Sequence, residues 1–579
     1  MLNSYMNQFK GAALVALMAG ALVACDKAEE TPAPHDLIIR GGTIVDGSGE
    51  ARFVGDVVVD DDRIVTISKG TSPETGEKEI DASGLIVAPG FINMLSWAPH
   101  TLIVDGRGMS DVLQGVTLEV MGEGSSMGPL NAEMKQTKLD QQGDLRFDIE
   151  WTSLGEYFDY MEARGISPNI ASFVGAETVR VHELGEDDVD PSAEQLDAMR
   201  GLVRTAMQEG ALGVGSSLIY APGTFAETDE LTALVSEAAK CDGMYISHMR
   251  SEGGNLLEAI DELITISRDS GAPAEIYHFK QAGQRNWDKL DDAIARVEAA
   301  RAEGLRITAD MYNYTAGATG LDAAMPTWVQ AGGYEKWRER LRDPETRARV
   351  AEEMKTPGDD WENLYAEAGG AEHVLLMGFK NPDLKKYTGM TLAAVAAERG
   401  TSAEETAMDL VIEDGTRVGV AYFLMSEDNI KRAVALPWMS FGSDAGAPAA
   451  EGAFLKSSTH PRAYGNFARL LGRYVREMKA TTLESAIHRM TAFPAGNLGL
   501  KDRGMLAPGY FGDIVIFDAD TITDHATYEQ PQQYATGVRD VFINGVQVVK
   551  EGEHTGATPG RALRGAGWTG WPDGGACTD

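Results

Sequence analysis

Cysteine is scarce in this chain of 579 residues, which contains only Cys25, Cys241 and Cys577. So few cysteines exclude the dense disulfide framework that stabilises many small secreted proteins. Cys241 and Cys577 could form a single bridge, but no pattern in the sequence supports that pairing.

Positive charge is also in short supply. The chain has 51 Lys and Arg residues against 88 Asp and Glu residues, a formal net charge of −37. Binding to nucleic acid or to anionic lipid is not expected, because phosphate contacts require a surplus of Lys and Arg. Hydrophobic residues make up 43% of the chain, which is typical of a globular protein.

The apolar run near the N-terminus, Gly11–Ala24, is too short to span a bilayer by itself. It ends in Leu22-Val23-Ala24-Cys25, which resembles a bacterial lipobox, so residues 1–24 are interpreted as a signal peptide. The resemblance implies that Cys25 is lipidated, which would tether an exported protein on the periplasmic side through residues 25–35. An ordinary secretory signal is the alternative. The lipid anchor would be the only membrane contact.

Two separate stretches have the residue pattern of short β-strands. They cover residues 36–90 and 497–554, with Gly41-Gly42 as a hairpin signal in the first and Asn544-Gly545 as a tight turn in the second. Strands at both ends of a long middle region predict one small β-sandwich built from both termini. Residues 555–579 are rich in glycine and are interpreted as an irregular tail.

The region between these stretches, residues 91–496, alternates between apolar strands and amphipathic helices. Short strands are expected at Gly213–Leu218, Arg306–Met311 and Trp438–Gly442. The helical patterns place apolar residues three and four positions apart, as in Leu256, Leu257, Ile260, Leu263 and Ile264. Such alternation predicts a parallel β/α barrel. A charged helical stretch at about 325–390 interrupts it and is interpreted as an inserted subdomain.

Two histidines follow consecutive strands of this predicted barrel. His248 and His278 are separated by 278 − 248 = 30 residues, about the length of one βαβ unit. The right-handed crossover of such a unit brings both strand ends to the same edge of a sheet, where active sites of β/α barrels lie. We therefore expect the two imidazoles to share a metal ion, although each could instead be a hydrogen-bonded core histidine.

An ordered set of motifs resembles a known family. The motifs are Asp36–Gly47, Val87–Ile92, Gly210–Tyr220, Ser247–Arg250, Gly442–Asp444 and His460–Arg462. Together they resemble the D-aminoacylase (N-acyl-D-amino-acid deacylase) branch of the amidohydrolase superfamily. The resemblance implies a (β/α)8 TIM-like barrel of the metal-dependent amidohydrolase type, with a small β-sandwich from both termini. It also implies a hydrolytic zinc site and substrates that carry an acyl group on a D-amino acid.

Carried onto this chain, the resemblance assigns His248 and His278 to the bound zinc and Asp444 to the general base. Neutral imidazoles suit Zn²⁺, and a catalytic zinc needs only about three protein ligands. One ion is expected, and another divalent metal is an alternative because imidazole and carboxylate ligands accept several. For Asp444, a Ser-Asp turn that caps the next helix is the structural alternative.

Three departures from the family pattern affect the site. Leu95-Ser96-Trp97 stands where the superfamily usually has His-x-His, so a second metal position should be absent. The usual Asn-Cys-Gly is missing, and Glu123 is the natural carboxylate substitute as third ligand, with Glu119 as the alternative. Glu177 stands where the family usually has a histidine.

Four residues are candidates for binding substrate. Arg250 and Lys280 each follow a site histidine by two residues, which on a strand would point them the same way, and Arg250 could grip a carboxylate. Tyr312 and Tyr314 match family tyrosines near the substrate. All four could instead form structural ion pairs or pack at the rim.

The predicted function is a metal-dependent hydrolase that cleaves a linear, non-peptide amide of a small molecule, an N-acyl-D-amino acid above all. A dipeptidase or a cyclic-amide hydrolase of the same superfamily is the first alternative. A lipoprotein that keeps the barrel but only binds a ligand is the second. The sequence does not give the acyl group, the amino acid, the stereochemical preference or the oligomeric state.

Overall fold

The computed structural model describes residues 33–358 and 361–578. The predicted signal peptide and the predicted lipidation site, Cys25, lie outside these residues. In the described part of the chain, no helix combines the length and the apolar character that crossing a bilayer requires.

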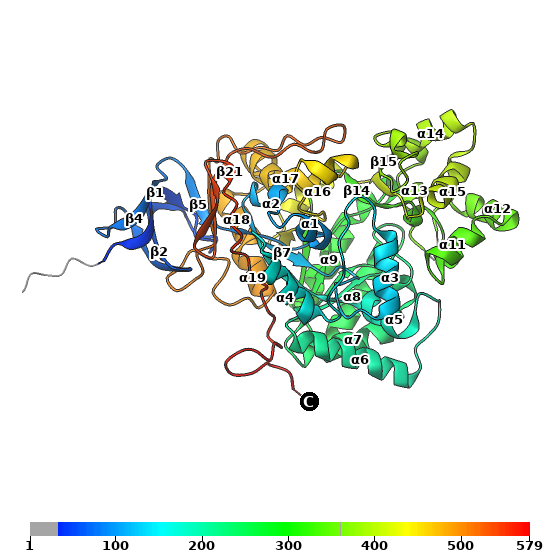
Figure 1. The fold of residues 1–579 in the computed structure, drawn as a ribbon, viewed down its shortest axis with the longest axis horizontal. Helices are drawn as coiled ribbons and strands as arrows, with labels where there is room; N and C mark the ends of the chain where they lie inside the picture. The colour runs from blue at the N-terminus through cyan, green and yellow to red at the C-terminus, as the bar shows by residue number, and fades with distance from the viewer. Residues whose placement is uncertain (1–32, 359–360, 579) are drawn as a thin grey trace, which may run out of the picture. The chain divides into compact units, whose positions relative to one another are not determined.

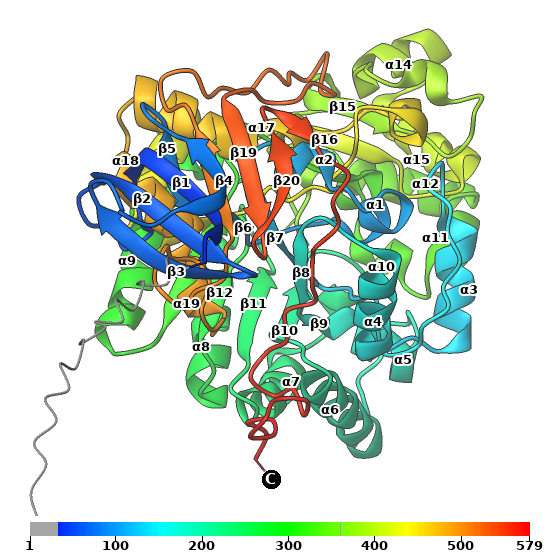
Figure 2. The same ribbon diagram turned by 60° about the vertical axis from the view of Figure 1, so that its left-hand side comes forward.

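Strands from the two ends of the chain form one nine-stranded sheet. The N-terminal and C-terminal strands meet where β5 pairs antiparallel with β18. Figure 2 shows the blue N-terminal strands beside the orange-red β19 and β20. The strands are β1 (His35–Ile44), β2 (Phe53–Asp60), β3 (Arg63–Lys69), β4 (Gly76–Asp81), β5 (Ile86–Pro89), β18 (Ile514–Phe517), β19 (Val538–Ile543), β20 (Val546–Lys550) and β21 (Glu553–His554).

The hairpin predicted at Gly41-Gly42 is wrong. β1 continues through both glycines and pairs with β2 on either side of them, with a register shift between Ile39 and Gly42. Gly41 has a φ of +66°, a left-handed conformation that glycine adopts at no steric cost. The glycine pair therefore makes a β-bulge within one strand, which bends it and changes its pairing register.

The middle of the chain forms parallel strands with helices between them. Six strands run in the order β17-β13-β12-β11-β10-β9, and three more in the order β6-β7-β8. Met94 N–H donates to Phe441 O at 3.2 Å, and Ser96 forms a β-bridge with Ala445. The segment after β6 thus pairs with the end of β17 and the residues that follow it, which closes the barrel. The bounds are β6 (Phe91–Asn93), β7 (Val116–Met121), β8 (Asn169–Ser172), β9 (Val174–Gly175), β10 (Gly213–Ser217), β11 (Met244–His248), β12 (Ala274–Ile276), β13 (Ile307–Met311) and β17 (Met439–Phe441).

The barrel helices follow the predicted periodicity. α8 (Leu256–Ser270) buries Leu256, Ile260, Leu263 and Ile264 on one face, as the spacing predicts. α6 (Ala193–Gln208) begins with a capping box in which the Ser192 hydroxyl accepts the Gln195 N–H and the Gln195 side chain accepts the Ser192 N–H. The other long barrel helices are α4 (Leu154–Arg164), α7 (Thr228–Ala239) and α9 (Leu290–Ala302).

The inserted region contains strands as well as the predicted helices. β14 (Ala316–Gly320), β16 (Gly419–Phe423) and β15 (Val374–Gly378) form an antiparallel sheet. Figure 1 shows α11, α12, α13 (Leu364–Glu367) and α15 gathered near this sheet. The insertion thus starts before residue 325 and ends after residue 390. Its main helices are α11 (Tyr334–Arg340), α12 (Pro344–Glu353), α14 (Leu392–Arg399) and α15 (Ala403–Asp414).

The C-terminal tail has no helix or strand in its described residues, 555–578, but it is bonded along the barrel. Leu563 N–H donates to Ile170 O at 2.7 Å, and Gly565 N–H donates to Gly210 O at 2.9 Å. Cys241, which precedes β11, forms a disulfide with Cys577. The tail therefore crosses the amino-terminal ends of the barrel strands, opposite to the ends that carry His248 and His278.

Candidate active site

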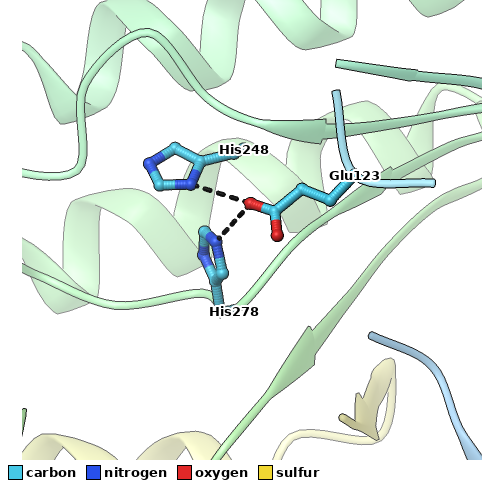
Figure 3. A group of neighbouring side chains, drawn as sticks. All are labelled: Glu123, His248 and His278. Carbon is cyan, nitrogen blue, oxygen red and sulfur yellow. Dashed lines mark hydrogen bonds and ion pairs between the residues drawn. The ribbon is translucent and has the colours of Figure 1, made fainter. Parts of the chain in front are cut away.

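Three buried side chains converge at the carboxyl ends of the barrel strands. His248 is the last residue of β11, His278 follows β12 by two residues, and Glu123 follows β7 by two residues. Figure 3 shows both imidazoles directed at the Glu123 carboxylate. Neighbouring parallel strands end at one edge, which is why residues so distant in sequence meet there.

The distances between these groups are short. Oε1 of Glu123 lies 3.0 Å from Nδ1 of His248 and 3.2 Å from Nε2 of His278. The two rings are nearly perpendicular, with centroids 4.4 Å apart. A ligand atom from each residue lies within 4.8 Å of the others, and the side chains are at most 5% exposed. This arrangement fits the donor set of a small divalent cation.

The side chains of Glu123, His248 and His278 shift one another's pKa values. Burial alone would raise the pKa of Glu123, but hydrogen bonds from His248 and His278 hold it well below its usual range. Burial and Lys280 lower the pKa of His278, yet Glu252 and Glu123 outweigh them and raise it to about 10. Burial lowers the pKa of His248. The carboxylate is thus ionised between two imidazoles at the centre of the site.

Glu252 is a site residue that the sequence interpretation missed. Its Oε1 lies 2.8 Å from Nδ1 of His278 and accepts a hydrogen bond from Nζ of Lys280, and it is 3% exposed. A carboxylate on the far nitrogen of a histidine fixes the orientation of the ring. The signal was available, since Glu252 follows His248 by four residues just after a strand end.

Asp444 follows β17 by three residues and faces the same cavity. Its φ of +49° is left-handed, and its backbone N–H donates to Leu95 O at 2.9 Å. Oδ2 lies 2.9 Å from Nη2 of Arg462, and Oδ1 accepts a hydrogen bond from Nε1 of Trp97 at 3.1 Å. Burial raises the pKa of Asp444, although Arg462 opposes the shift. The strained backbone is held by contacts on both sides.

A cavity of about 870 Å³ opens onto these groups. Lys280 and Tyr312, two of the predicted substrate residues, line it together with Arg462. The Tyr312 hydroxyl and the Nε and Nη1 atoms of Arg462 are buried and have no hydrogen-bond partner among the described residues. Two residues of the cavity wall therefore carry polar donors that the described protein groups do not satisfy.

The structure does not bring Arg250 to this cavity. Its guanidinium donates to both carboxylate oxygens of Glu262, at 2.9 and 3.0 Å, and to the carbonyls of Thr224 and Ala226. The alternation of side chains that predicted its direction ends at His248, because β11 ends there. Arg250 is thus held in a structural ion pair in the loop.

Two other candidates lie away from the cavity wall. Tyr314 donates to Oδ2 of Asp524 at 3.2 Å and is not among the described residues that line the cavity. Glu119, the alternative to Glu123, lies inside the barrel and accepts a hydrogen bond from Asn93 at 2.9 Å. By contrast, Glu177 does line the cavity, and burial raises its pKa to about 8.

Comparisons with known proteins place this geometry in a family. Residues 78–549 match the model of the Amidohydrolase family. The chain belongs to this family. It is 32% identical over 539 residues to D-aminoacylase of Alcaligenes xylosoxydans xylosoxydans, covering 92% of this chain and 98% of that protein. It is likewise 32% identical over 533 residues to N-acyl-D-glutamate deacylase of the same organism, covering 91% and 96%.

Solved structures agree with these relatives. The crystal structure of D-aminoacylase superposes with a TM-score of 0.76 at 30% identity, covering 92% of this chain and all of that one. N-acyl-D-glutamate deacylase from Bordetella bronchiseptica, solved with zinc and a phosphonate inhibitor, gives 0.75 at 29% identity over 92% and 100%. The resemblance to D-aminoacylase and the amidohydrolase fold are confirmed. The chain is a metal-dependent amidohydrolase, an enzyme that cleaves amide bonds.

Proposed function

We propose that this amidohydrolase deacylates an N-acyl-D-amino acid and holds one divalent ion, zinc in the first instance, between Glu123, His248 and His278. The convergence of these three buried side chains is the observation that carries the proposal. Relatives named D-aminoacylase, N-acyl-D-glutamate deacylase and N-acyl-D-aspartate deacylase support the substrate class.

The residues fit a catalytic zinc. Two imidazoles and one carboxylate form a His₂Glu set, which leaves a fourth position open. The second nitrogen of His278 is engaged by Glu252, as is usual for a metal-binding histidine. When bound, the ion supplies Lewis-acid activation of the amide carbonyl and lowers the pKa of a water to about 7.

Asp444 performs the proton transfers in this proposal. Its carboxylate accepts the proton of the attacking water and later gives it to the departing amine, as a general base and then a general acid. Arg462 holds Oδ2 at 2.9 Å, so Oδ1 is the edge that faces the reaction. A pKa above that of an ordinary aspartate, caused by burial, makes the group a better base than an exposed carboxylate.

The unsatisfied donors of the cavity would bind the substrate carboxylate. The guanidinium of Arg462 lies 4.4 Å from the Tyr312 ring centroid, so its free nitrogens and the Tyr312 hydroxyl belong to one patch. Lys280 Nζ lies 5.6 Å from the same ring. A carboxylate next to these three groups would satisfy donors whose burial is otherwise costly.

Hydrolysis of a substrate panel tests the proposal. The panel contains N-acetyl D- and L-amino acids, dipeptides, hydantoin and dihydroorotate, each assayed before and after chelation and after return of zinc. We expect release of the free amino acid from an N-acetyl-D-amino acid, loss of activity with chelator and recovery with zinc. Activity only on dipeptides or cyclic amides would select that alternative, and no turnover by zinc-loaded protein would leave a binding-only lipoprotein.

We also propose that the enzyme works outside the cytoplasm, anchored through Cys25. The Cys241–Cys577 disulfide supports export, since disulfides persist in oxidising compartments. Expression in a bacterial host should leave the wild type in the membrane fraction and release Cys25→Ser. A wild type found entirely in the cytosol with free thiols would contradict this location.

A further inference from the structure

Trp97 occupies the wall of the cavity between two strand ends. It follows β6 and is 45% exposed, and it lines the cavity. Its backbone N–H donates to Ala445 O at 2.9 Å, and the neighbouring Asp444 N–H donates to Leu95 O at 2.9 Å. The segment that carries Trp97 is thus bonded directly to the segment that carries Asp444.

The indole N–H is shared between two carboxylates. Nε1 of Trp97 lies 2.9 Å from Oε2 of Glu123 and 3.1 Å from Oδ1 of Asp444. Glu123 follows β7 and Asp444 follows β17, so one donor links groups from both sides of β6. The opposite oxygens of these carboxylates face other partners: Oε1 of Glu123 faces the imidazoles, and Oδ2 of Asp444 faces Arg462.

Two ionised carboxylates in one buried site repel each other. This repulsion is felt at Asp444, where Glu123 adds to the upward shift of the pKa that burial causes. A donor placed between them lowers the repulsion, because hydrogen bonds to charged acceptors are stronger than neutral ones. An indole has no titration in the physiological range and does not depart as an exchangeable ion would.

We propose that Trp97 is a positioning residue of the hydrolytic site: its single indole N–H fixes the carboxylates of Asp444 and Glu123 relative to each other. This inference rests on the proposed function, since it assigns Glu123 to the metal and Asp444 to proton transfer. It adds that Oε2 of Glu123 is kept for Trp97, so that only Oε1 is presented toward the histidines. No second cation is then needed to bring the two carboxylates together.

The substitution Trp97→Phe tests this role, because it keeps an aromatic ring and removes only the N–H. The matched control is Trp328→Phe. Trp328 lies on α10 (Thr327–Gln330), outside the cavity, and the substitution removes its indole hydrogen bond to Glu353 (2.9 Å). Each purified protein is loaded with one equivalent of Co²⁺. The measurements are kcat and KM, the metal content, the visible spectrum of bound Co²⁺ and the melting temperature.

We expect Trp97→Phe to lower kcat by roughly 10- to 100-fold, because that is the effect of losing one hydrogen bond to charged groups. KM should change by less than about 3-fold. Its Co²⁺ spectrum should shift, because Oε2 of Glu123 becomes free, while metal content stays near one ion per chain. Trp328→Phe should match the wild type in kcat and spectrum.

Trp97→Phe with an unchanged kcat and an unchanged Co²⁺ spectrum would overturn the inference. A melting temperature lowered equally in both variants, with kcat lowered equally, would overturn it too, since the effect would be structural. If the wild type turns over no substrate, the proposed function fails, and the Co²⁺ spectrum of Trp97→Phe still decides the role of Trp97.

Discussion

Two buried glutamates of the same barrel have pKa values that are shifted in opposite directions. Glu275, on β12, accepts hydrogen bonds from Thr308 and Asn497 on one oxygen and from Ser440 on the other, and burial raises its pKa to about 7. Glu123, equally enclosed, has a pKa well below the usual range because His248 and His278 face it. The difference lies in the partners, not in the burial.

The comparison separates two kinds of hydrogen-bond partner by their chemistry. Hydroxyl and amide donors satisfy a carboxylate without carrying charge, so they offset only part of the cost of burying an ion. Imidazoles can carry a proton or leave their nitrogens to a cation, so the carboxylate between them stays ionised. An ionised carboxylate beside two imidazoles attracts a divalent cation, whereas the Glu275 network only stabilises the fold.

Removing the carboxylate of each glutamate in turn should produce the largest difference between the two sites. We expect Glu123→Gln to lose its bound metal and more than about 100-fold of its activity, beyond the range seen for groups that only orient a ligand. Glu275→Gln, the matched control, should keep the metal. Elemental analysis after gel filtration, with kcat/KM on the best N-acetyl-D-amino acid, measures both. Equal metal content in the two variants would remove the distinction.

Asp444 should affect catalysis without affecting the metal. Asp444→Asn removes the base, so kcat should fall by about 10²- to 10⁴-fold, while metal content stays near that of the wild type. In the wild type, kcat/KM should fall as the pH drops through the raised pKa of Asp444, because the base must be ionised. Loss of metal from Asp444→Asn would instead make this residue a ligand.

The disulfide at the opposite end should affect stability alone. Cys577→Ser removes a disulfide between residues 336 positions apart. Its loss should lower the free energy of unfolding by about 2–5 kcal/mol. We expect a lower melting temperature, the same fall in wild type treated with a reductant, and kcat within about 2-fold of wild type, since Cys577 lies far from the strand ends that carry the site. A large loss of kcat at 25 °C would show that the two ends are coupled.

The smallest effect is expected at Glu275, as a change with pH. Its raised pKa means that the folded state favours the neutral acid. This contribution to stability is complete below about pH 4.5 and is lost as the pH rises through about 7. The free energy of unfolding of wild type relative to Glu275→Gln should therefore fall by roughly 1 kcal/mol per pH unit in that window. Urea unfolding at several pH values measures it, and a constant difference would mean that Glu275 is ionised.

The sequence was sufficient to predict the site residues that lie at or just after the ends of strands. His248, His278 and Asp444 each follow a clear apolar strand, so their edge of the barrel could be predicted. The choice between Glu123 and Glu119 could not, because it depends on where β7 ends: Glu119 lies within the strand, and Glu123 lies two residues beyond it. Only the structure shows Glu119 bonded to Asn93 inside the barrel.

Contacts between distant segments were beyond the sequence pattern. Trp97 and Arg462 contact Asp444 although Trp97 is distant from it in the sequence, and no spacing in the chain predicts either contact. The strand Ala316–Gly320 consists of Ala, Gly and Thr, so it lacks the alternation that predicts a strand. Arg250 was assigned a direction from a strand that had already ended at His248.

Anomalous diffraction from crystals of the protein, collected at the zinc edge, tests the central claim most directly. The account predicts one peak per chain at about 2.0–2.2 Å from a nitrogen of His248, a nitrogen of His278 and Oε1 of Glu123. A fully active crystal form with no peak among these three residues, or with its peak elsewhere, would contradict it.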